Sequence, residues 1–331
     1  MKTLEDYILP TQDELFDMLC EEYKGNCFVR KDSYILVKGK APIMLIAHMD
    51  TVHKERVKYI CKSKGGKILM SPQGIGGDDR CGIYALNAVY ARAEVKPWLL
   101  FTCDEEIGGY GARDFAKDYH MADLPKELDF LKCLVEIDRK GKKDAVYYSC
   151  DNEEFEDYIT GKGFVTGWGS FSDISIIAPE MGIAAVNLSS GYYNAHTLYE
   201  YINRQELNDT IGKVLSIVSD SVKKDFPVYE YIESKYSYDY DDWSYYGLNG
   251  WYSYKSDKEE IDTQFKNIPA SIRDEYEALL DYHSKQELDN IRKEMGDDWI
   301  VKLFETEFGG TFEEVFGELN DHYEDDEEEE M

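Results

Sequence analysis

Short apolar runs alternate with amphipathic stretches through the first two thirds of this 331-residue chain. Each apolar run has the length and composition of a buried strand, and the stretches between them have helical periodicity. This alternation is typical of an α/β domain, in which a mostly parallel central sheet is flanked by helices. The predicted strands are 34–37, 43–47, 98–103, 133–137 and 184–188. The predicted helices are 11–23, 82–93, 112–119 and 205–222.

Acidic charge separates the chain into two parts. The net charge is -30 at pH 7, and residues 226–331 contain 31 acidic against 9 basic residues. We predict an α/β domain at 1–225 and a Tyr-rich, acidic C-terminal extension at 226–331, irregular with a helical stretch at 269–295. Residues 318–331 include the run EDDEEEE and are expected to be disordered. The apolar residues at helical spacing in the extension are Ile272, Tyr276, Leu279, Leu280 and Leu288.

Charge and hydropathy limit the partners and the compartment. A chain this acidic repels nucleic-acid phosphates and anionic membrane surfaces, so we expect neither a nucleic-acid nor a membrane partner. No apolar run approaches the ~20 residues that span a bilayer, and the opening MKTLED is no secretory signal, so we expect a cytoplasmic protein. The seven cysteines are scattered without CxxC pairs and predict neither disulfides nor a Cys-based zinc site. The oligomeric state is not encoded in any pattern that we find.

Acids or a histidine follow three of the predicted strands directly. IMLIA runs into HMD at 48–50, WLLFTC into DEE at 104–106, and LVEI into Asp138. Because the carboxyl ends of parallel strands meet at one edge of a sheet, these side chains are predicted to gather there. The loop GIGGDDRCG adds Asp78 and Asp79, and the turn SSGYYNAH adds His196. Imidazoles and carboxylates together are ligands for zinc or a related divalent cation, and a bridging carboxylate favours a pair of ions.

Five motifs occur in the order HMDTV, GGDDRCG, DEEIGGYGA, EID and NAHTLYE, over roughly residues 30–220. In this order they resemble the co-catalytic di-zinc exopeptidases, a group of metallohydrolases that includes peptidase T, glutamate carboxypeptidase and bacterial leucyl aminopeptidase. The resemblance implies a three-layer zinc-exopeptidase-like (phosphorylase/hydrolase-like) fold for a catalytic domain at 1–225. It also implies two divalent metal ions, zinc in the first place, with manganese or cobalt as alternatives.

The resemblance implies a ligand role for five residues. His48 and Asp138 would bind one metal ion. Glu106 and His196 would bind the other, and Asp78 would bridge the two. A structural role stays open as the alternative for Asp138, which could form a surface ion pair with its neighbour, and for His196, which could be a turn residue.

The resemblance also implies catalytic roles beside the metal ions. Glu105 matches the general base, which takes a proton from water and returns it to the departing amine. Asp50 would buttress the imidazole of His48 and fix its tautomer. Tyr192 or Tyr193 would donate a hydrogen bond to the oxyanion.

Other polar residues remain outside this assignment. Asp79 is interpreted as a helix cap, and Glu200 as a residue near the substrate, a helix cap or a plain turn residue. The acids proposed to bind a substrate ammonium group at a rim are Glu136, Asp151, Glu153, Glu154 and Asp173. The histidines predicted not to be ligands are His53, His120, His283 and His322.

The spacing of the motifs limits which activities within this group are expected. Only 30 positions separate His48 from Asp78 and 58 separate Asp138 from His196, which leaves no room for the lid or dimerisation domain that many relatives insert. Such a lid binds a substrate carboxylate, so an aminopeptidase or dipeptidase acting on a peptide or small amide is favoured over a carboxypeptidase. Two alternatives remain: an amidohydrolase that deacylates N-acyl amino acids, and a non-catalytic binding protein that retains the fold.

Overall fold

The computed structural model describes residues 2–169 and 171–234. Near the C-terminus it describes Pro269, Ile272, Tyr276, Leu279, Leu288, 291–293 and 295–308. The chain divides into two compact units, Met1–Tyr238 and Asp239–Met331. The predicted domain division at 225/226 stays a prediction. The expected disorder of 318–331, most of the Tyr-rich stretch and position 280 lie outside the described residues.

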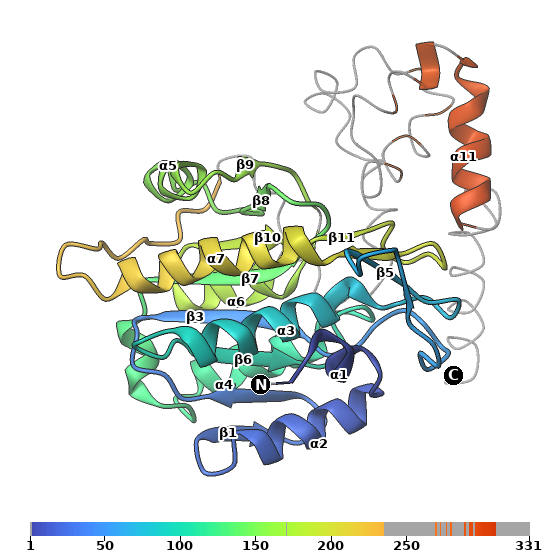
Figure 1. Cartoon of the computed structure of the whole chain (residues 1–331). Coiled ribbons are helices and arrows are strands. Elements are labelled where there is room, and N and C mark those ends of the chain that lie inside the picture. Colours follow the sequence, from blue (N-terminus) through green and yellow to red (C-terminus); the bar gives the residue numbers. More distant parts are fainter. Residues whose placement is uncertain are drawn as a thin grey trace, which may run out of the picture. The chain divides into compact units, whose positions relative to one another are not determined.

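A mostly parallel eight-stranded sheet forms the middle of the first unit (Figure 1). Its strand order is β1-β2-β6-β3-β7-β10-β8-β9. The central neighbours β6, β3, β7 and β10 run parallel, whereas β1/β2, β2/β6 and β10/β8 are antiparallel. The strands are β1 (Cys27–Arg30), β2 (Tyr34–Val37), β3 (Ile43–His48), β6 (Trp98–Thr102), β7 (Cys133–Arg139), β8 (Asp144–Val146), β9 (Val165–Thr166) and β10 (Ala185–Ser189).

Helices cover both faces of this sheet, which makes three layers. On one face lie α1 (Leu4–Ile8), α2 (Gln12–Glu22), α3 (Gly77–Arg92), α5 (Glu153–Gly161) and α7 (Arg204–Ser221). On the other lie α4 (Tyr110–His120) and α6 (Asp173–Met181). A short 3-10 helix, Lys126–Phe130, precedes β7. The predicted α/β fold with a mostly parallel sheet between helices is confirmed.

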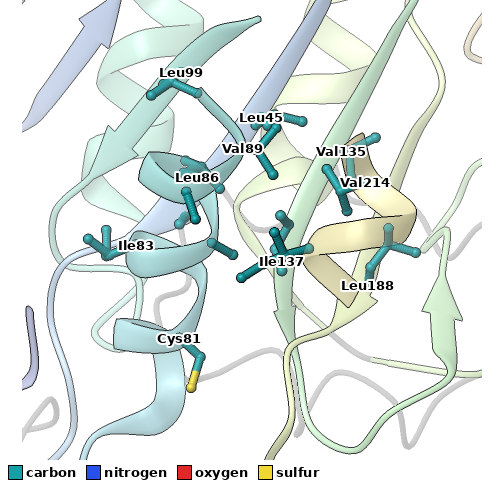
Figure 2. Packing of buried hydrophobic residues seen from close by; sticks show 14 of the residues in the cluster. Leu45, Cys81, Ile83, Leu86, Val89, Leu99, Val135, Ile137, Leu188 and Val214 are labelled. Atoms are coloured by element: carbon teal, nitrogen blue, oxygen red, sulfur yellow. The ribbon is translucent and has the colours of Figure 1, made fainter. Parts of the chain in front are cut away.

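The alternation of side chains along the central strands produces two separate apolar cores. In β3, Leu45 packs with the core on the α3 side, whereas Met44 and Ile46 pack with the core on the α4 side. Figure 2 shows Leu86 of α3 among the side chains of the first core, which also includes Val135 from β7. A strand that is buried on both faces has to be apolar at nearly every position, which is why these runs could be recognised in the sequence.

A second, smaller sheet joins loops that are distant in sequence. It is antiparallel in the order β11-β12-β5-β4. Its strands are β4 (Cys61–Lys62), β5 (Ile68–Met70), β11 (Tyr192–Tyr193) and β12 (Tyr201–Asn203). Because β12 pairs with β5, the chain that follows β10 lies beside the chain that leads into α3.

Residues 226–234 belong to the first unit and pair with its backbone. The N–H of Tyr229 donates to the carbonyl of Lys132 at 2.9 Å, and the carbonyl of Tyr229 accepts from Ala184 at 2.8 Å. Further along, the N–H of Asp151 donates to the carbonyl of Ile232 at 2.7 Å. The first nine residues of the predicted extension therefore add backbone pairing to the α/β unit.

The second unit has an apolar cluster of its own. Its described helical elements include α11 (Asp298–Phe308). Tyr276, Leu279 and Leu288, which the sequence places at helical spacing, are in helical conformation. The buried residues of the cluster are Ile272, Tyr276, Leu279, Leu288, Ile300 and Phe304. Across the described parts of both units, no helix combines the length and the apolar character needed to cross a membrane.

Candidate active site

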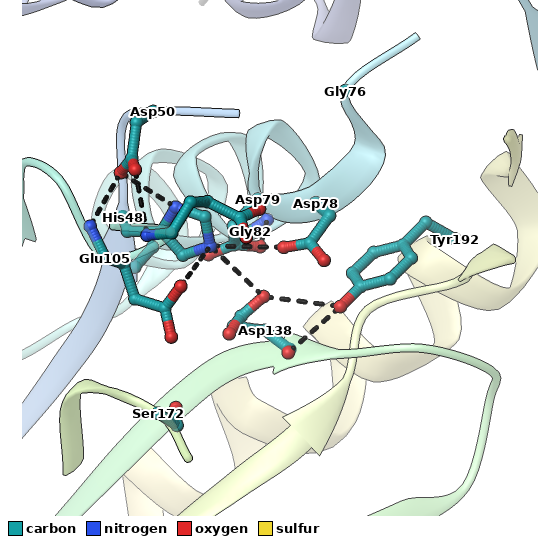
Figure 3. A network of polar contacts seen from close by, with 12 residues as sticks. His48, Asp50, Gly76, Asp78, Asp79, Gly82, Glu105, Asp138, Ser172 and Tyr192 are labelled. Atoms are coloured by element: carbon teal, nitrogen blue, oxygen red, sulfur yellow. Dashed lines mark hydrogen bonds and ion pairs between the residues drawn. The ribbon is translucent and has the colours of Figure 1, made fainter. Parts of the chain in front are cut away.

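The carboxyl ends of three neighbouring strands bring predicted site residues together. His48 is the last residue of β3, Asp138 lies near the end of β7, and Glu105 follows β6 by three positions. Since β3 pairs in parallel with both β6 and β7, these ends meet at one edge of the sheet. Figure 3 shows the three side chains directed toward one another. His48 Nε2 lies 3.6 Å from Asp138 Oδ1 and 3.9 Å from Glu105 Oε2.

Asp78 lies between the two histidines. Its Oδ1 is 3.1 Å from His48 Nε2, and its Oδ2 is 3.3 Å from His196 Nε2. His196 Nε2 is also 3.1 Å from Glu106 Oε2. One carboxylate is therefore shared by two groups, His48 with Asp138 and His196 with Glu106. These are the two groups that the resemblance implies, and their roles as metal ligands stay predictions.

The start of α3 separates the roles of two adjacent acids. Asp78 and Asp79 have non-helical backbone angles, and the peptide bond between them is cis. Asp78 faces the histidines, whereas Asp79 is fully buried and its Oδ1 accepts the N–H of Gly82 at 2.9 Å. Asp79 thus makes a capping contact inside the helix and is absent from the ligand groups that the described residues form.

Asp50 connects the end of β3 to the turn after β6. Its Oδ1 lies 3.1 Å from His48 Nδ1. The same carboxylate accepts the backbone N–H of Glu105 at 3.1 Å and that of Glu106 at 3.0 Å. A carboxylate on Nδ1 keeps the proton on that nitrogen and leaves Nε2 to face the cluster.

The side chains of Tyr192 and Asn187 form hydrogen bonds with Asp138. The hydroxyl of Tyr192, which is buried, donates to the carbonyl oxygen of Asp138 at 3.1 Å and lies 3.3 Å from its Oδ1 (Figure 3). Asn187 Oδ1 accepts the N–H of Asp138 at 2.9 Å. The structure thus engages the Tyr192 hydroxyl with Asp138, and its role at the oxyanion stays a prediction. The hydroxyl of Tyr193 donates elsewhere, to Glu206 Oε2 at 2.5 Å.

Crowding of buried carboxyls disfavours their ionised forms. Burial, reinforced by the Asp78 carboxylate, raises the pKa of Asp138 to about 8. Burial and Asp78 also raise the pKa of Glu106. Burial, together with Glu106 and Asp138, raises the pKa of Glu105 well above its ordinary value. The ionised forms of these three carboxyls are therefore disfavoured by burial and by one another.

The same carboxyl groups favour the charged form of His48, whose pKa they raise. Burial alone would lower the pKa of His48, but Asp138 and Asp50 raise it well above its ordinary value. Burial alone would raise the pKa of Asp78, but hydrogen bonds with His196 and His48 keep it well below its ordinary value. Positive charge is thus stabilised at both faces of Asp78.

The donor set fits divalent cations. The described residues form three groups whose ligand atoms lie within 4.8 Å of one another: His48 with Asp78 and Asp138, His48 with Glu105 and Glu106, and Asp78 with Glu106 and His196. Glu106 Oε1 is buried and has no hydrogen-bond partner among the described residues. A buried carboxylate oxygen of this kind is an unused ligand atom, and mixed imidazole and carboxylate donors suit zinc, manganese or cobalt.

Two acids expected at a substrate-binding rim lie elsewhere. Glu136 and Asp173 are fully buried, where they contact Ser172 and Thr102 respectively, so the prediction that they form a rim is wrong. Glu136 shares the face of β7 that Asp138 uses, because the two are two positions apart in a strand. The other three proposed rim acids are exposed: Asp151, Glu153 and Glu154.

Some contributors to the site were not anticipated. Asn187 was not recognised, although a polar residue inside the apolar run of β10 is a signal for a buried contact. His53 lies outside the three ligand groups, as does the exposed His120. His53 instead contacts Glu200, at 2.8 Å between Nε2 and Oε2. The remaining two predicted non-ligands, at 283 and 322, lie outside the described residues.

Several solved structures resemble the chain in fold. No protein-family model matches it, and no curated protein matches it in sequence. The aminopeptidase PepT from Bacillus cereus is 16% identical, with 66% of this chain and 97% of that chain covered and a TM-score of 0.49. A tripeptidase from Staphylococcus aureus has the same identity and score, with 66% and 96% covered. A TET aminopeptidase from a marine sediment Thaumarchaeota archaeon is 13% identical, with 66% and 95% covered and a TM-score of 0.49. These values are too low to transfer an activity to this chain.

Proposed function

We propose that the protein is a metal-dependent hydrolase that uses two divalent cations to cleave a peptide or small amide bond, as an aminopeptidase or dipeptidase. The observation that carries the proposal is the position of Asp78, whose two carboxylate oxygens face the Nε2 atoms of His48 and His196 at 3.1 and 3.3 Å. A carboxylate with its oxygens turned to two separate imidazoles is suited to bridge a pair of cations.

Each proposed cation has its own ligands in addition to Asp78. His48 and Asp138 would hold the first ion, and Glu106 and His196 the second. Zinc suits this donor set, with manganese or cobalt as alternatives. When bound, the two cations would polarise the scissile carbonyl and lower the pKa of the attacking water.

Glu105 is the proposed proton carrier in this reaction. Its Oε2 lies 3.9 Å from His48 Nε2. Glu105 and Glu106 are adjacent in sequence but have different proposed roles, proton transfer for Glu105 and metal binding for Glu106. Burial raises the pKa of Glu105, which favours a group that accepts a proton from the attacking water and then gives it to the departing amine nitrogen. No covalent bond between substrate and enzyme is needed, because water is the nucleophile.

The test combines metal content with hydrolysis of paired substrates. Purified full-length protein is loaded with zinc and freed of unbound metal, and the zinc bound per protein chain is measured by inductively coupled plasma mass spectrometry. Leucine and alanine p-nitroanilides are then compared with their N-acetylated forms. Two equivalents of metal and hydrolysis of the free-amine substrates only would support an aminopeptidase. Release of acetate without release of nitroaniline would favour the deacylase, and no bound metal would refute the proposal.

A further inference from the structure

A buried carboxylate holds the backbone that presents Asp78. Glu200 is completely buried. Its Oε2 accepts the N–H of Gly76 at 2.9 Å, and its Oε1 accepts the N–H of Asp78 at 3.0 Å. His53 Nε2 donates to the same Oε2 at 2.8 Å. One side chain therefore satisfies three donors, two of which bracket the peptide that leads into Asp78.

Three separate segments meet in this arrangement, and each also carries a proposed ligand. His53 is five residues after His48, and Glu200 is four residues after His196. The third segment supplies Asp78 itself. The contacts of Glu200 thus hold three loops together through residues that are not themselves proposed ligands, apart from the backbone of Asp78. A displacement of the loop that carries Asp78 would alter the distances from Asp78 to both histidines.

The glycines before Asp78 allow the close approach of these loops. Gly76 has a φ of +63°, and a Cβ there would meet Thr51 Cγ2 at 2.9 Å. A Cβ on Gly74 would meet the ring of His53 at 2.2 Å. The loop therefore packs directly against Thr51 and His53, and its backbone N–H groups reach Glu200 without an intervening side chain.

We propose that Glu200, oriented by His53, is a positioning residue that fixes the backbone of Asp78 so that its two carboxylate oxygens stay turned toward His48 and His196. The role concerns the geometry of the bridging carboxylate and rests on the proposed function, in which Asp78 joins two cations. Residues that orient metal ligands in this way typically change metal affinity by about 10- to 100-fold when they are replaced. Glu200 touches neither substrate nor cation in this scheme.

Glu200→Gln tests the proposal with a minimal change of shape. The amide retains one acceptor oxygen and replaces the other with an NH₂ group, so the N–H of either Gly76 or Asp78 loses its acceptor. The matched control is Glu206→Gln. Glu206 also accepts a hydrogen bond, from the Tyr193 hydroxyl, but among the described residues it has no hydrogen bond to the loop before Asp78. His53→Leu removes the donor to Glu200, and His53→Gln retains one as a conservative rescue.

Two measurements on the full chain separate this proposal from the proposed function. Calorimetric titration of metal-free protein with zinc gives the number and affinity of the bound ions. Hydrogen exchange of the peptide 74–79, followed by mass spectrometry without metal, reports the backbone hydrogen bonds directly. We expect Glu200→Gln and His53→Leu to weaken at least one zinc equivalent about 10- to 100-fold and to speed exchange at 74–79, whereas Glu206→Gln and His53→Gln stay near the parent.

Each outcome decides the matter. Parent-like zinc affinities in both Glu200→Gln and His53→Leu would overturn the proposal. If the parent itself binds no zinc, the proposed function fails, and exchange alone decides on the positioning role: unchanged exchange at 74–79 in Glu200→Gln refutes it. If circular dichroism shows that Glu200→Gln does not fold, the two His53 variants decide, and equal zinc affinities in His53→Leu and His53→Gln refute the role.

Discussion

Asp50 Oδ1 lies 3.1 Å from His48 Nδ1, on the side of the imidazole opposite the ligand cluster. The carboxylate of Asp50 also accepts the backbone N–H groups of Glu105 and Glu106. It therefore orients the imidazole and the turn after β6 at the same time. Loss of this one side chain should disturb both proposed metal ions.

Asp50→Asn should lower zinc affinity and kcat/KM by about 10- to 100-fold. The amide has one acceptor oxygen in place of two, so it cannot accept from His48, Glu105 and Glu106 together. Zinc titration and steady-state hydrolysis of an aminoacyl p-nitroanilide measure the two effects. Unchanged zinc affinity in this variant would show that Asp50 does not orient the ligands.

Glu105→Gln should lower kcat by about 10²- to 10⁴-fold, the usual contribution of a general base, while two equivalents of metal remain bound. The neighbouring Asp104→Asn is the control, because Asp104 accepts a hydrogen bond from the side chain of Gln12 and belongs to none of the ligand groups of the described residues. Turnover and metal content are measured on the same samples. Equal losses of turnover in both variants would remove the assignment of Glu105 as the base.

Tyr192→Phe distinguishes two roles for one hydroxyl. Since the hydroxyl donates to Asp138, its removal should weaken binding of the zinc ion that His48 and Asp138 are proposed to hold. We expect a fall in zinc affinity that accounts for the loss of activity at low zinc, with activity largely restored at saturating zinc. A low kcat that persists at saturating zinc would instead indicate that Tyr192 stabilises the oxyanion.

Chelation should destabilise the protein reversibly. Cations that bind the folded cluster offset the repulsion among Glu105, Glu106 and Asp138, and a ligand at 100 times its Kd stabilises the folded state by about 2.7 kcal/mol. Differential scanning calorimetry before and after treatment with EDTA, and again after zinc is restored, measures the change in Tm. Magnesium at the same concentration is the control for general ionic effects. A Tm that does not respond to EDTA or zinc would contradict a folded-state metal site.

The central strands could be predicted because burial on both faces leaves a continuous apolar run. This holds for β3 and β10, whose predicted ends lie within one residue of the observed ones. Strands without that pattern were missed. The two-residue β9 is exposed, and β11 and β12 depend on pairing with each other and with β5. Helix α6 was missed as well, and it contains Pro179 near its end.

In the candidate site, too, residues with a local sequence signal could be predicted and contacts that depend on the tertiary fold could not. His48, Glu105 and Asp138 could be located because a polar residue at the end of a buried strand is a local signal. The grouping of His48 with Asp138 and of Glu106 with His196 came from the resemblance of ordered motifs. The contacts of Glu200 with the loop before Asp78 could not be foreseen, because they require the loops after β5 and β11 to meet through the small antiparallel sheet.

The tight fit of the loop before Asp78 has a consequence for how this protein can vary. At Gly74 an added methyl group would overlap the imidazole of His53, and at Gly77 it would lie 2.6 Å from Tyr192 Cβ. In a saturation library across this loop, glycine should therefore be strongly enriched at both positions among the variants that fold. Sequence variation near Asp78 is therefore expected to concentrate at positions where an added side chain meets open space.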